Sequence, residues 1–401
     1  MTDIRTELLT EGYWDRAAEV ERALREQAPV HRAIQRDGAP VWVIGSFAEA
    51  RAALNDPRLA KDSDRLNEII RAKRDPSAGQ ELSGLFSKHM LNADPPDHTR
   101  LRKLLARDFT VRRIAALRPR VQELVTGLLD ELPTGEPLDL IERFAFPLPI
   151  TVICELLGVP EGDRSRFREW TAALLVPDPI EQSLTASREM AAFFHELFAA
   201  KRAAPGEDLI SALTGASADE DRLTEEELLA TAFLLIVAGH ETTVNLVGNG
   251  ARWLLAEPAK WAALRERPEL LPDAVEEVLR YDGPLRMSTH RFTAEDVTIG
   301  GTTIPAGELV LINLTSANRD GEQFEQADEL DLDRGRTGHL AFGHGLHHCL
   351  GAPLARLEGE VAFQELTRRF PGARLAAGEA ELRRSRGLVM NGFLALPVVL
   401  G

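Results

Sequence analysis

The sequence is poor in the features that mark secreted and nucleic-acid-binding proteins. Cysteine occurs only twice in 401 residues, which argues against a disulfide framework and fits a reducing cytoplasm. Lysine and arginine total 47 against 63 acidic residues, so the net charge of −16 offers no basic footprint for nucleic acid. The first residues lack a basic segment followed by an apolar one, so we expect no secretion signal.

Long apolar runs are also missing. The strongest run, 228–239, is shorter than the roughly 18 residues that a membrane span needs, and it is expected to be a buried helix. No internal repeat, low-complexity tract or long linker divides the chain. We therefore expect a cytoplasmic protein that binds no membrane and folds as a single domain over residues 1–401.

Helical periodicity dominates what is present. The longest periodic segment is apolar on nearly all sides, which predicts a helix through the centre of the protein. Thr224 and Glu227 form a capping-box pattern at its start. The fold is therefore expected to be mainly α with a minor β portion. The expected helices are 15–27, 121–131, 140–157, 187–201 and 225–256, and the expected strands are 39–44, a hairpin over 297–304, and 309–314.

The two cysteines differ in their surroundings. Cys154 lies in an apolar run and is interpreted as a small buried side chain. Cys349 lies in the glycine-rich segment FGHGLHHCLG (342–351), just before a run of good helix formers. Glycine lets a backbone bend close to a flat cofactor, and a helix start favours a thiolate. From these residues alone, cofactor ligation competes with a buried thiol and with a Cys/His metal site that uses His344, His347 and His348.

Polar residues interrupt the long apolar helix at AGHETT (238–243). Polar groups are costly at such a place unless they are used. The Thr242 hydroxyl can turn back to the carbonyl of Ala238, and Gly239 removes bulk at the same turn. A small ligand and water would then fit beside the helix. A packing glycine with a solvated Glu241 is the simpler alternative.

Charged residues form three further patterns. Glu277 and Arg280 share a helical face. As a surface ion pair they would stabilise the helix by about 0.3 kcal/mol. His98 and Arg102 lie four apart on another predicted helix, where a solvated basic face is the alternative. Residues 100–120 hold eight basic residues and one acid, which indicates either a solvated face or a docking patch for an acidic protein.

Together these segments resemble the cytochrome P-450 family. The cysteine segment resembles the family's haem-binding loop, Phe-x-x-Gly-x-His/Arg-x-Cys-x-Gly, and 238–242 resembles its Ala-Gly-x-Glu/Asp-Thr signature. Residues 94–102 resemble Asp-Pro-Pro-x-His-x-x-x-Arg, and Glu277 with Arg280 resembles Glu-x-x-Arg. The motifs follow the family's order from about residue 90 to residue 358.

The resemblance implies a triangular-prism fold with one haem b between the long central helix and the helix after the cysteine loop. Cys349 would ligate the iron, and electron donation from the thiolate is a known property of the family. Glu241 and Thr242 would be catalytic, as an acid–alcohol pair that delivers protons during dioxygen activation. The residues implied to bind the haem are His98, Arg102, Ala238, Gly239, Arg291, Phe342, Gly343, His347 and Gly351.

The implied reaction is insertion of one oxygen atom from O₂ into an organic substrate, by hydroxylation or epoxidation, in secondary metabolism or xenobiotic oxidation. Electrons would come from NAD(P)H through a ferredoxin reductase and a ferredoxin, and the protein would be a monomer. Glu277 and Arg280 would form a buried structural pair joined by Arg334. The alternatives are a haem-thiolate protein that binds or senses without turnover, a family member that catalyses oxidative coupling, and a Cys/His zinc protein.

The resemblance also implies where the substrate would bind. The corresponding regions are 66–90, 174–180, 233–237, 285–289 and 389–390, and they are mainly apolar. A medium or large apolar substrate is therefore expected. Arg286 is the exception, and it could meet a carboxylate, a propionate or solvent. The residues expected to line the substrate pocket are Val237, Leu285, Arg286, Met287 and Val389.

Overall fold

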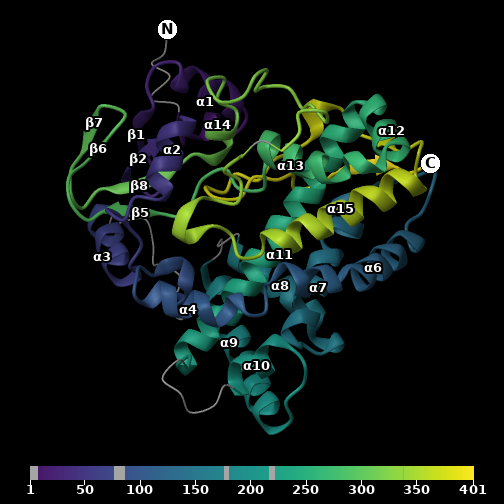
Figure 1. The fold of residues 1–401 in the computed structure, drawn as a ribbon, viewed down its shortest axis with the longest axis horizontal. Coiled ribbons are helices and arrows are strands. Elements are labelled where there is room, and N and C mark those ends of the chain that lie inside the picture. The colour runs from purple at the N-terminus through teal and green to yellow at the C-terminus, as the bar shows by residue number, and fades with distance from the viewer. Residues whose placement is uncertain (1–7, 76–85, 176–179, 216–221, 337) are drawn as a thin grey trace.

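The structure is a computed structural model that describes residues 8–75, 86–175, 180–215, 222–336 and 338–401. Helices fill most of the molecule, and the strands of the largest sheet and of the hairpin lie together at one side (Figure 1). This arrangement confirms the expected mainly α fold with a minor β portion. The expectation of one domain over residues 1–401 stays a prediction.

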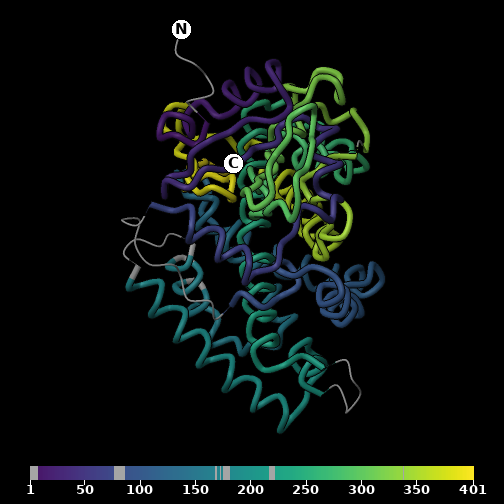
Figure 2. The backbone as a smooth tube through the Cα atoms, turned by 90° about the vertical axis from the view of Figure 1, so that its left-hand side faces the viewer, coloured from purple at the N-terminus to yellow at the C-terminus, as the bar shows by residue number. Residues whose placement is uncertain are grey.

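The central helix is α11 (Glu225–Ala256), with the bounds that the sequence predicts. The hydroxyl of Thr224 accepts a hydrogen bond from the N–H of Glu227 at 3.2 Å, and the Glu227 carboxylate accepts one from the N–H of Thr224 at 2.8 Å. These two bonds form the predicted capping box. In the turned view of Figure 2, α11 runs as a central column through the molecule.

Among the described residues, α11 is the one helix that is long and apolar enough, by length and composition, to cross a membrane. Of its apolar window, 67% is buried inside the protein. A helix that is hydrophobic all round and buried by its neighbours is a core helix. The burial therefore agrees with the interpretation of this segment as a buried helix.

Three helices that frame the core pack against α11: α7 (Pro147–Leu157), α13 (Leu271–Asp282) and α15 (Ala352–Arg369). The approach of α15 is especially close, because a Cβ atom on Gly250 of α11 would overlap the ring of Phe363 on α15. Only glycine leaves room for this ring to pack directly on the backbone of α11. A large apolar cluster joins these helices into one core.

The largest sheet has the strand order β1-β2-β8-β5-β3. Strands β2 and β8 are parallel, and the other neighbours are antiparallel. The predicted hairpin is present, and its turn uses Gly300 and Gly301, both with positive φ. The strands are β1 (Val30–Ile34), β2 (Pro40–Ile44), β3 (Leu59–Ala60), β4 (Pro137–Asp139), β5 (Arg291–Thr293), β6 (Val297–Ile299), β7 (Thr302–Ile304), β8 (Leu309–Ile312), β9 (Arg374–Leu375) and β10 (Pro397–Val399).

The remaining helices surround this frame. They are α1 (Ala17–Arg25), α2 (Phe47–Leu54), α3 (Ser63–Lys73), α4 (Asp97–Ala106), α5 (Val111–Ala116), α6 (Arg118–Asp130), α8 (Arg164–Leu175), α9 (Ile180–Ala203), α10 (Leu209–Gly215), α12 (Pro258–Glu266) and α14 (Leu314–Asn318). Of these, α4 matters most for the site, because it carries the His98 and Arg102 pair.

Three predicted elements differ clearly from the observed ones. The predicted helix 187–201 is only part of α9, which begins at Ile180 and ends at Ala203. The predicted helix 140–157 is divided into a π-helical turn, Ile141–Ala145, and α7, because the ring of Pro147 cannot donate a backbone hydrogen bond. The predicted strand 309–314 ends at Ile312. There the side chain of Asn313 accepts a hydrogen bond from the N–H of Ser316 and caps α14.

A buried ion pair ties α13 to the irregular segment before the cysteine loop. The Arg280 guanidinium is 0% exposed and donates to both carboxylate oxygens of Glu277 at 2.7 Å. It also donates to the carbonyls of Asn318, Ala327 and Glu329. Arg334 donates to the same Glu277 carboxylate at 3.1 Å. This cluster, here called the anchor, therefore satisfies backbone carbonyls that have no helix or sheet to bond them.

The anchor gives a prediction of stability. Glu277→Ala should lower the free energy of unfolding by about 3–5 kcal/mol, because it leaves two buried guanidinium groups without their carboxylate. Chemical denaturation of the purified, intact protein measures this loss. The control is Asp333→Asn, which removes an exposed ion pair with Arg267 and should cost less than about 0.5 kcal/mol. Equal effects of the two substitutions would contradict the role given to the anchor.

Candidate active site

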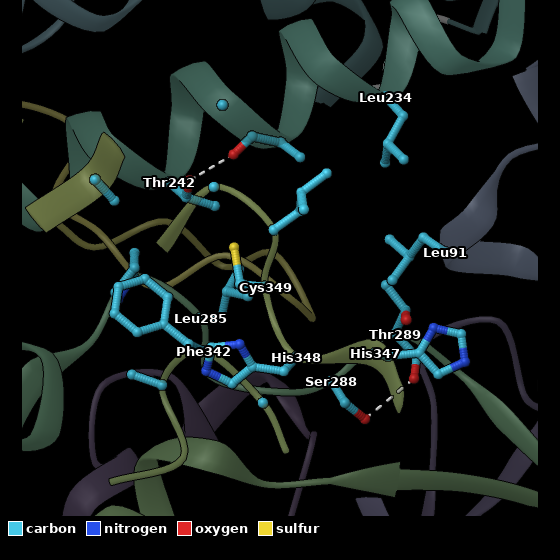
Figure 3. Close-up of a pocket in the computed structure, with 18 of the residues that line it drawn as sticks. Leu91, Leu234, Thr242, Leu285, Ser288, Thr289, Phe342, His347, His348 and Cys349 are labelled. Atoms are coloured by element: carbon cyan, nitrogen blue, oxygen red, sulfur yellow. Dashed lines mark hydrogen bonds between the residues drawn. The ribbon is translucent and has the colours of Figure 1, made fainter. Parts of the chain in front are cut away.

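The described residues enclose a large cavity between α11 and the cysteine loop (Figure 3). Its empty volume is about 1500 Å³, including the mouth that opens to solvent. The cavity therefore lies between the cysteine loop and the 238–243 segment of α11, and residues of both line it.

The cysteine loop forms one wall of the cavity. Gly343 and Gly345 adopt φ values of 70° and 68°, in the left-handed region that favours glycine. The N–H of Cys349 donates to the carbonyl of Phe342 at 2.8 Å and closes the loop. Figure 3 shows the sulfur directed toward the helix that carries Thr242. The loop thus presents one sulfur atom to the interior of the cavity.

The electrostatics around Cys349 act in opposite directions. Burial raises the pKa of the thiol, whereas the backbone N–H groups of Gly351 and Ala352, at the start of α15, lower it together with Arg102. N–H groups aimed at a sulfur favour its thiolate form. A metal cation at the sulfur would add the charge needed to deprotonate it fully. The wall therefore fits a thiolate ligand of a metal.

Helix α11 forms the opposite wall with Ala238, Gly239, Thr242 and Thr243. The Thr242 hydroxyl donates to the carbonyl of Ala238 at 2.5 Å, which confirms the predicted hydrogen bond four residues back. A Cβ on Gly239 would lie 3.2 Å from Ile153 Cδ1 of α7, so glycine keeps these helices close. A small, partly polar surface therefore faces the sulfur.

Glu241 lies beside this surface but is not among the described residues that line the cavity. Burial raises the pKa of its carboxyl group. A carboxylic acid with a raised pKa keeps its proton closer to neutral pH than an exposed glutamate does. Glu241 and Thr242 therefore place a carboxyl group with a raised pKa and a hydroxyl group on adjacent positions of one helix.

Four of the basic side chains that line the cavity are those expected to bind haem: His98 and Arg102 of α4, Arg291 of β5, and His347 of the cysteine loop. The rings of His98 and His347 lie 4.4 Å apart, edge to face. Both ring nitrogens of His98, Nε2 of His347 and Nε of Arg291 are buried and lack a hydrogen-bond partner. Burial lowers the pKa of Arg291 to about 10 and that of His347 to about 2.

Buried donors without acceptors are costly. Carboxylates form their strongest hydrogen bonds with donors such as the N–H groups of arginine and protonated histidine. The two propionates of haem would supply such carboxylates, while Cys349 would supply the axial ligand. The residues present therefore fit haem on three independent counts: a sulfur, a cavity beside it and an edge with buried arginine and histidine donors.

The rival zinc site is not supported. Within the described part of the chain, no three His, Cys, Asp or Glu side chains are grouped so that they could hold a metal ion. A protein zinc site uses at least three such ligands. His344, His347 and His348 therefore do not combine with Cys349 into a metal centre.

Comparison with known proteins agrees with this geometry. Residues 256–373 match the family model described as Cytochrome P450. The chain is 49% identical over 380 residues to Cytochrome P450 107B1 of Saccharopolyspora erythraea, covering 94% of this chain and 93% of that protein. It is 43% identical to 6-deoxyerythronolide B hydroxylase of the same organism, with 94% of each chain covered. The chain belongs to the cytochrome P450 family.

The structural comparison extends to the whole fold. The tirandamycin C-bound P450 monooxygenase TamI superposes with a TM-score of 0.91 and 44% identity, over 98% of this chain and 99% of that one. The P450 fold expected from the motifs is therefore confirmed. Membership of the family makes this P450 an oxidoreductase and implies haem and O₂ as its cofactor and co-substrate.

The structure corrects part of the expected substrate pocket. Leu285 and Val389 line the cavity of this P450, but Val237, Arg286 and Met287 are not among its described lining residues. Arg286 is buried elsewhere, where it donates to Glu21 at 3.0 Å and to Asn391 at 2.6 Å. It is therefore not free to meet a substrate carboxylate.

Met287 packs instead into a separate apolar cluster next to the sheet. Of the regions expected to form the pocket, residues 76–85 and 176–179 lie outside the described residues. Sequence reasoning also missed several residues of the lining, because no local motif marks them. They are Lys61, Leu91, Leu246 and Glu358, whereas Leu234, Ser288 and Thr289 line the cavity within the expected regions.

Proposed function

We propose that this P450 is a haem-thiolate monooxygenase that inserts one oxygen atom from O₂ into an apolar organic substrate. The observation that carries the proposal is the placement of Cys349 and Thr242 on opposite walls of one cavity with a cationic edge. When bound, haem would supply the activation of O₂, helped by electron donation from the thiolate. Cys349 would hold the iron, and His98, Arg102, Arg291 and His347 would hold the propionates.

Thr242 and Glu241 would manage protons on the distal wall. The Thr242 hydroxyl accepts a hydrogen bond as easily as it donates one, and it is already held in place by the carbonyl of Ala238. Glu241 would hold the proton that Thr242 passes into the cavity, since burial raises the pKa of its carboxyl group. Ala238 and Gly239 leave room for the small molecules involved.

The substrate is proposed to be a medium or large apolar molecule. Leu91, Leu234, Leu285 and Val389 supply apolar side chains to the cavity. Two related proteins are named for a 6-deoxyerythronolide B hydroxylase activity and for bound tirandamycin C. We therefore favour hydroxylation or epoxidation of a secondary metabolite as the reaction.

Electrons would reach the site from NAD(P)H through a ferredoxin reductase and a ferredoxin. The basic segment 100–120 supports a docking surface for the ferredoxin. This surface would include fewer arginines than the sequence indicates, because Arg100, Arg118 and Arg120 already form ion pairs with acidic residues of the chain. Among the described residues, no ion pair is found for Arg107 or Arg112. These two arginines would be the contact for an acidic partner.

The docking surface would also be close to the metal ligand. Arg102 of α4 donates to the carbonyl of His348, next to Cys349, and α5 packs against α15. An electron carrier seated there would approach the cysteine loop directly. We further propose that the protein is a cytoplasmic monomer, which agrees with its two cysteines and with the burial of α11.

The metal ligand is tested by spectroscopy. Cys349→Ser should abolish the thiolate Soret band of the reduced, CO-bound protein, because a serine hydroxyl is not a thiolate donor. Cys154→Ser is the matched control, since this cysteine is buried in α7 and burial raises its pKa to about 12. The control should retain the band. A wild-type protein without the band would overturn the proposed function.

Proton delivery is tested by coupling. Thr242→Ala should lower the yield of oxidised product per NAD(P)H consumed by about ten-fold or more and increase peroxide release, because one proton-transfer group is typically worth about 10²-fold or more. Thr243→Ala is the control, since Thr243 also lines the cavity but donates to the carbonyl of Gly239. Equal coupling in Thr242→Ala and wild type would show that the assignment is wrong.

Docking is tested by charge reversal. Arg112→Glu should slow ferredoxin-driven turnover several-fold at low salt, and the difference should shrink as ionic strength rises, because electrostatic steering is screened. Arg265→Glu serves as the control, since Arg265 is an exposed arginine on α12. If the effect of Arg112→Glu does not depend on salt, the docking surface lies elsewhere.

A further inference from the structure

A buried lysine lies at the edge of the cavity and belongs to none of the motifs. Lys61 follows β3 directly and is 2% exposed. Its side chain lines the same cavity as Cys349. Its ammonium group donates to the hydroxyl of Thr289 at 2.5 Å. Lysine is rarely buried without a charged partner, so this position needs an explanation.

The sheet places Lys61 opposite a second cation. Strands β3 and β5 are antiparallel, with Leu59 opposite Thr293 and Ala60 opposite Phe292. The same register, continued by one residue, puts Lys61 opposite Arg291. Like charges that face each other on neighbouring strands destabilise the pair. The charge of Arg291 accordingly contributes to lowering the pKa of Lys61.

No carboxylate neutralises this pair. Asp94 and Asp56 are the acids whose charges act on this pair. However, Asp94 Oδ2 accepts from the backbone N–H groups of Lys61 and Asp62, and Asp56 forms an ion pair with Arg58. Within the described residues, no acidic side chain forms an ion pair with Lys61 or Arg291. The charged and titratable groups around Lys61 are Arg291, Asp94, His89, His98, His290 and His347.

The energetics of this cluster favour an anion. Burial and Arg291 lower the pKa of Lys61 to about 7, against the opposing effect of Asp94. A buried cation without a partner is costly, and an anion placed between two cations removes the cost. Both ring nitrogens of His98, Nε2 of His347 and Nε of Arg291 also lack a hydrogen-bond partner, while the other two nitrogens of Arg291 donate only to backbone carbonyls, those of Leu59 and Leu54. The cluster is therefore organised around a negative charge that the chain itself does not provide.

We propose that Lys61 is a further haem-binding residue, whose ammonium group pairs with a propionate carboxylate beside Arg291. Thr289 acts as the positioning residue that holds the ammonium at the cavity edge. Lys61, Thr289 and His347 line the same cavity, and the charge of Lys61 acts on the pKa values of His98 and His347. Because these histidines are proposed to bind the propionates, this neighbourhood favours a propionate over the carboxylate of a substrate. The inference rests on the proposed haem function.

The experiment measures the rate at which haem leaves the holoprotein for an excess of apomyoglobin. Lys61→Met keeps the length of the side chain and removes its charge, and it should accelerate haem release by roughly ten-fold, equivalent to about 1.4 kcal/mol. Lys61→Arg should restore slow release. Lys260→Met, at an exposed ion pair with Glu257, is the matched control and should match wild type.

A second arm identifies the carboxylate. Holoprotein prepared with the dimethyl ester of haem has no propionate charge, so Lys61→Met and wild type should then release the cofactor at similar rates. Unchanged release of ordinary haem from Lys61→Met would overturn the proposal. A further outcome is that Lys61→Met releases haem at the wild-type rate but shows a weaker spin shift when myristate is added. Lys61 would then bind the carboxylate of a substrate, and the proposal would also be overturned.

If Lys61→Met folds poorly, a second variant tests the proposal. Thr289→Val removes the hydroxyl that holds the ammonium and should accelerate haem release by a smaller factor, with no change when the ester is used. The thiolate Soret band of the reduced, CO-bound form separates this inference from the proposed function. Loss of that band in wild type overturns both, whereas a retained band with unchanged haem release overturns only the role of Lys61.

Discussion

The position of the Cys349 sulfur depends on the buried pair of Glu277 and Arg280. The segment between α14 and the cysteine loop contains no described helix or strand of its own, so its carbonyl groups need other donors. Arg280 supplies three of these hydrogen bonds, and Glu277 fixes Arg280 and Arg334. Because the cysteine loop begins where this segment ends, the anchor determines where the loop meets α15. The packing of α15 on α11 then sets the separation of the two walls.

The second constraint is the charge at the cavity edge. Basic groups that are buried without acidic partners make the cofactor-free state costly, and a ligand that carries two carboxylates compensates for it. Anything that binds the native state alone also stabilises it. The cationic edge therefore links cofactor binding to folding. The anchor behaves differently, because there the protein supplies its own carboxylate, and that part of the fold is independent of the cofactor.

Sequence reasoning succeeded where the signal is local. Three features depend only on residues that are close together in the sequence. They are the capping box of α11, the hydrogen bond from Thr242 to Ala238, and the cysteine loop. It failed where partners come from distant segments. Arg286 was expected to line the pocket, but its partner Glu21 lies 265 residues away and draws it into the core. Lys61 was missed for the same reason, since only the pairing of β3 with β5 brings it to Arg291.

The two ends of the cavity are specified by different kinds of interaction. The cofactor end uses charges and a sulfur in fixed geometry, so small changes there should affect binding strongly. The substrate end is formed by side chains such as Leu91, Leu234 and Val389. An apolar pocket distinguishes ligands mainly by shape, and one methylene is worth only about 1–3 kcal/mol. Substrate choice can therefore change through a few apolar substitutions while the cofactor end stays intact, which is how one fold can serve many related oxidations.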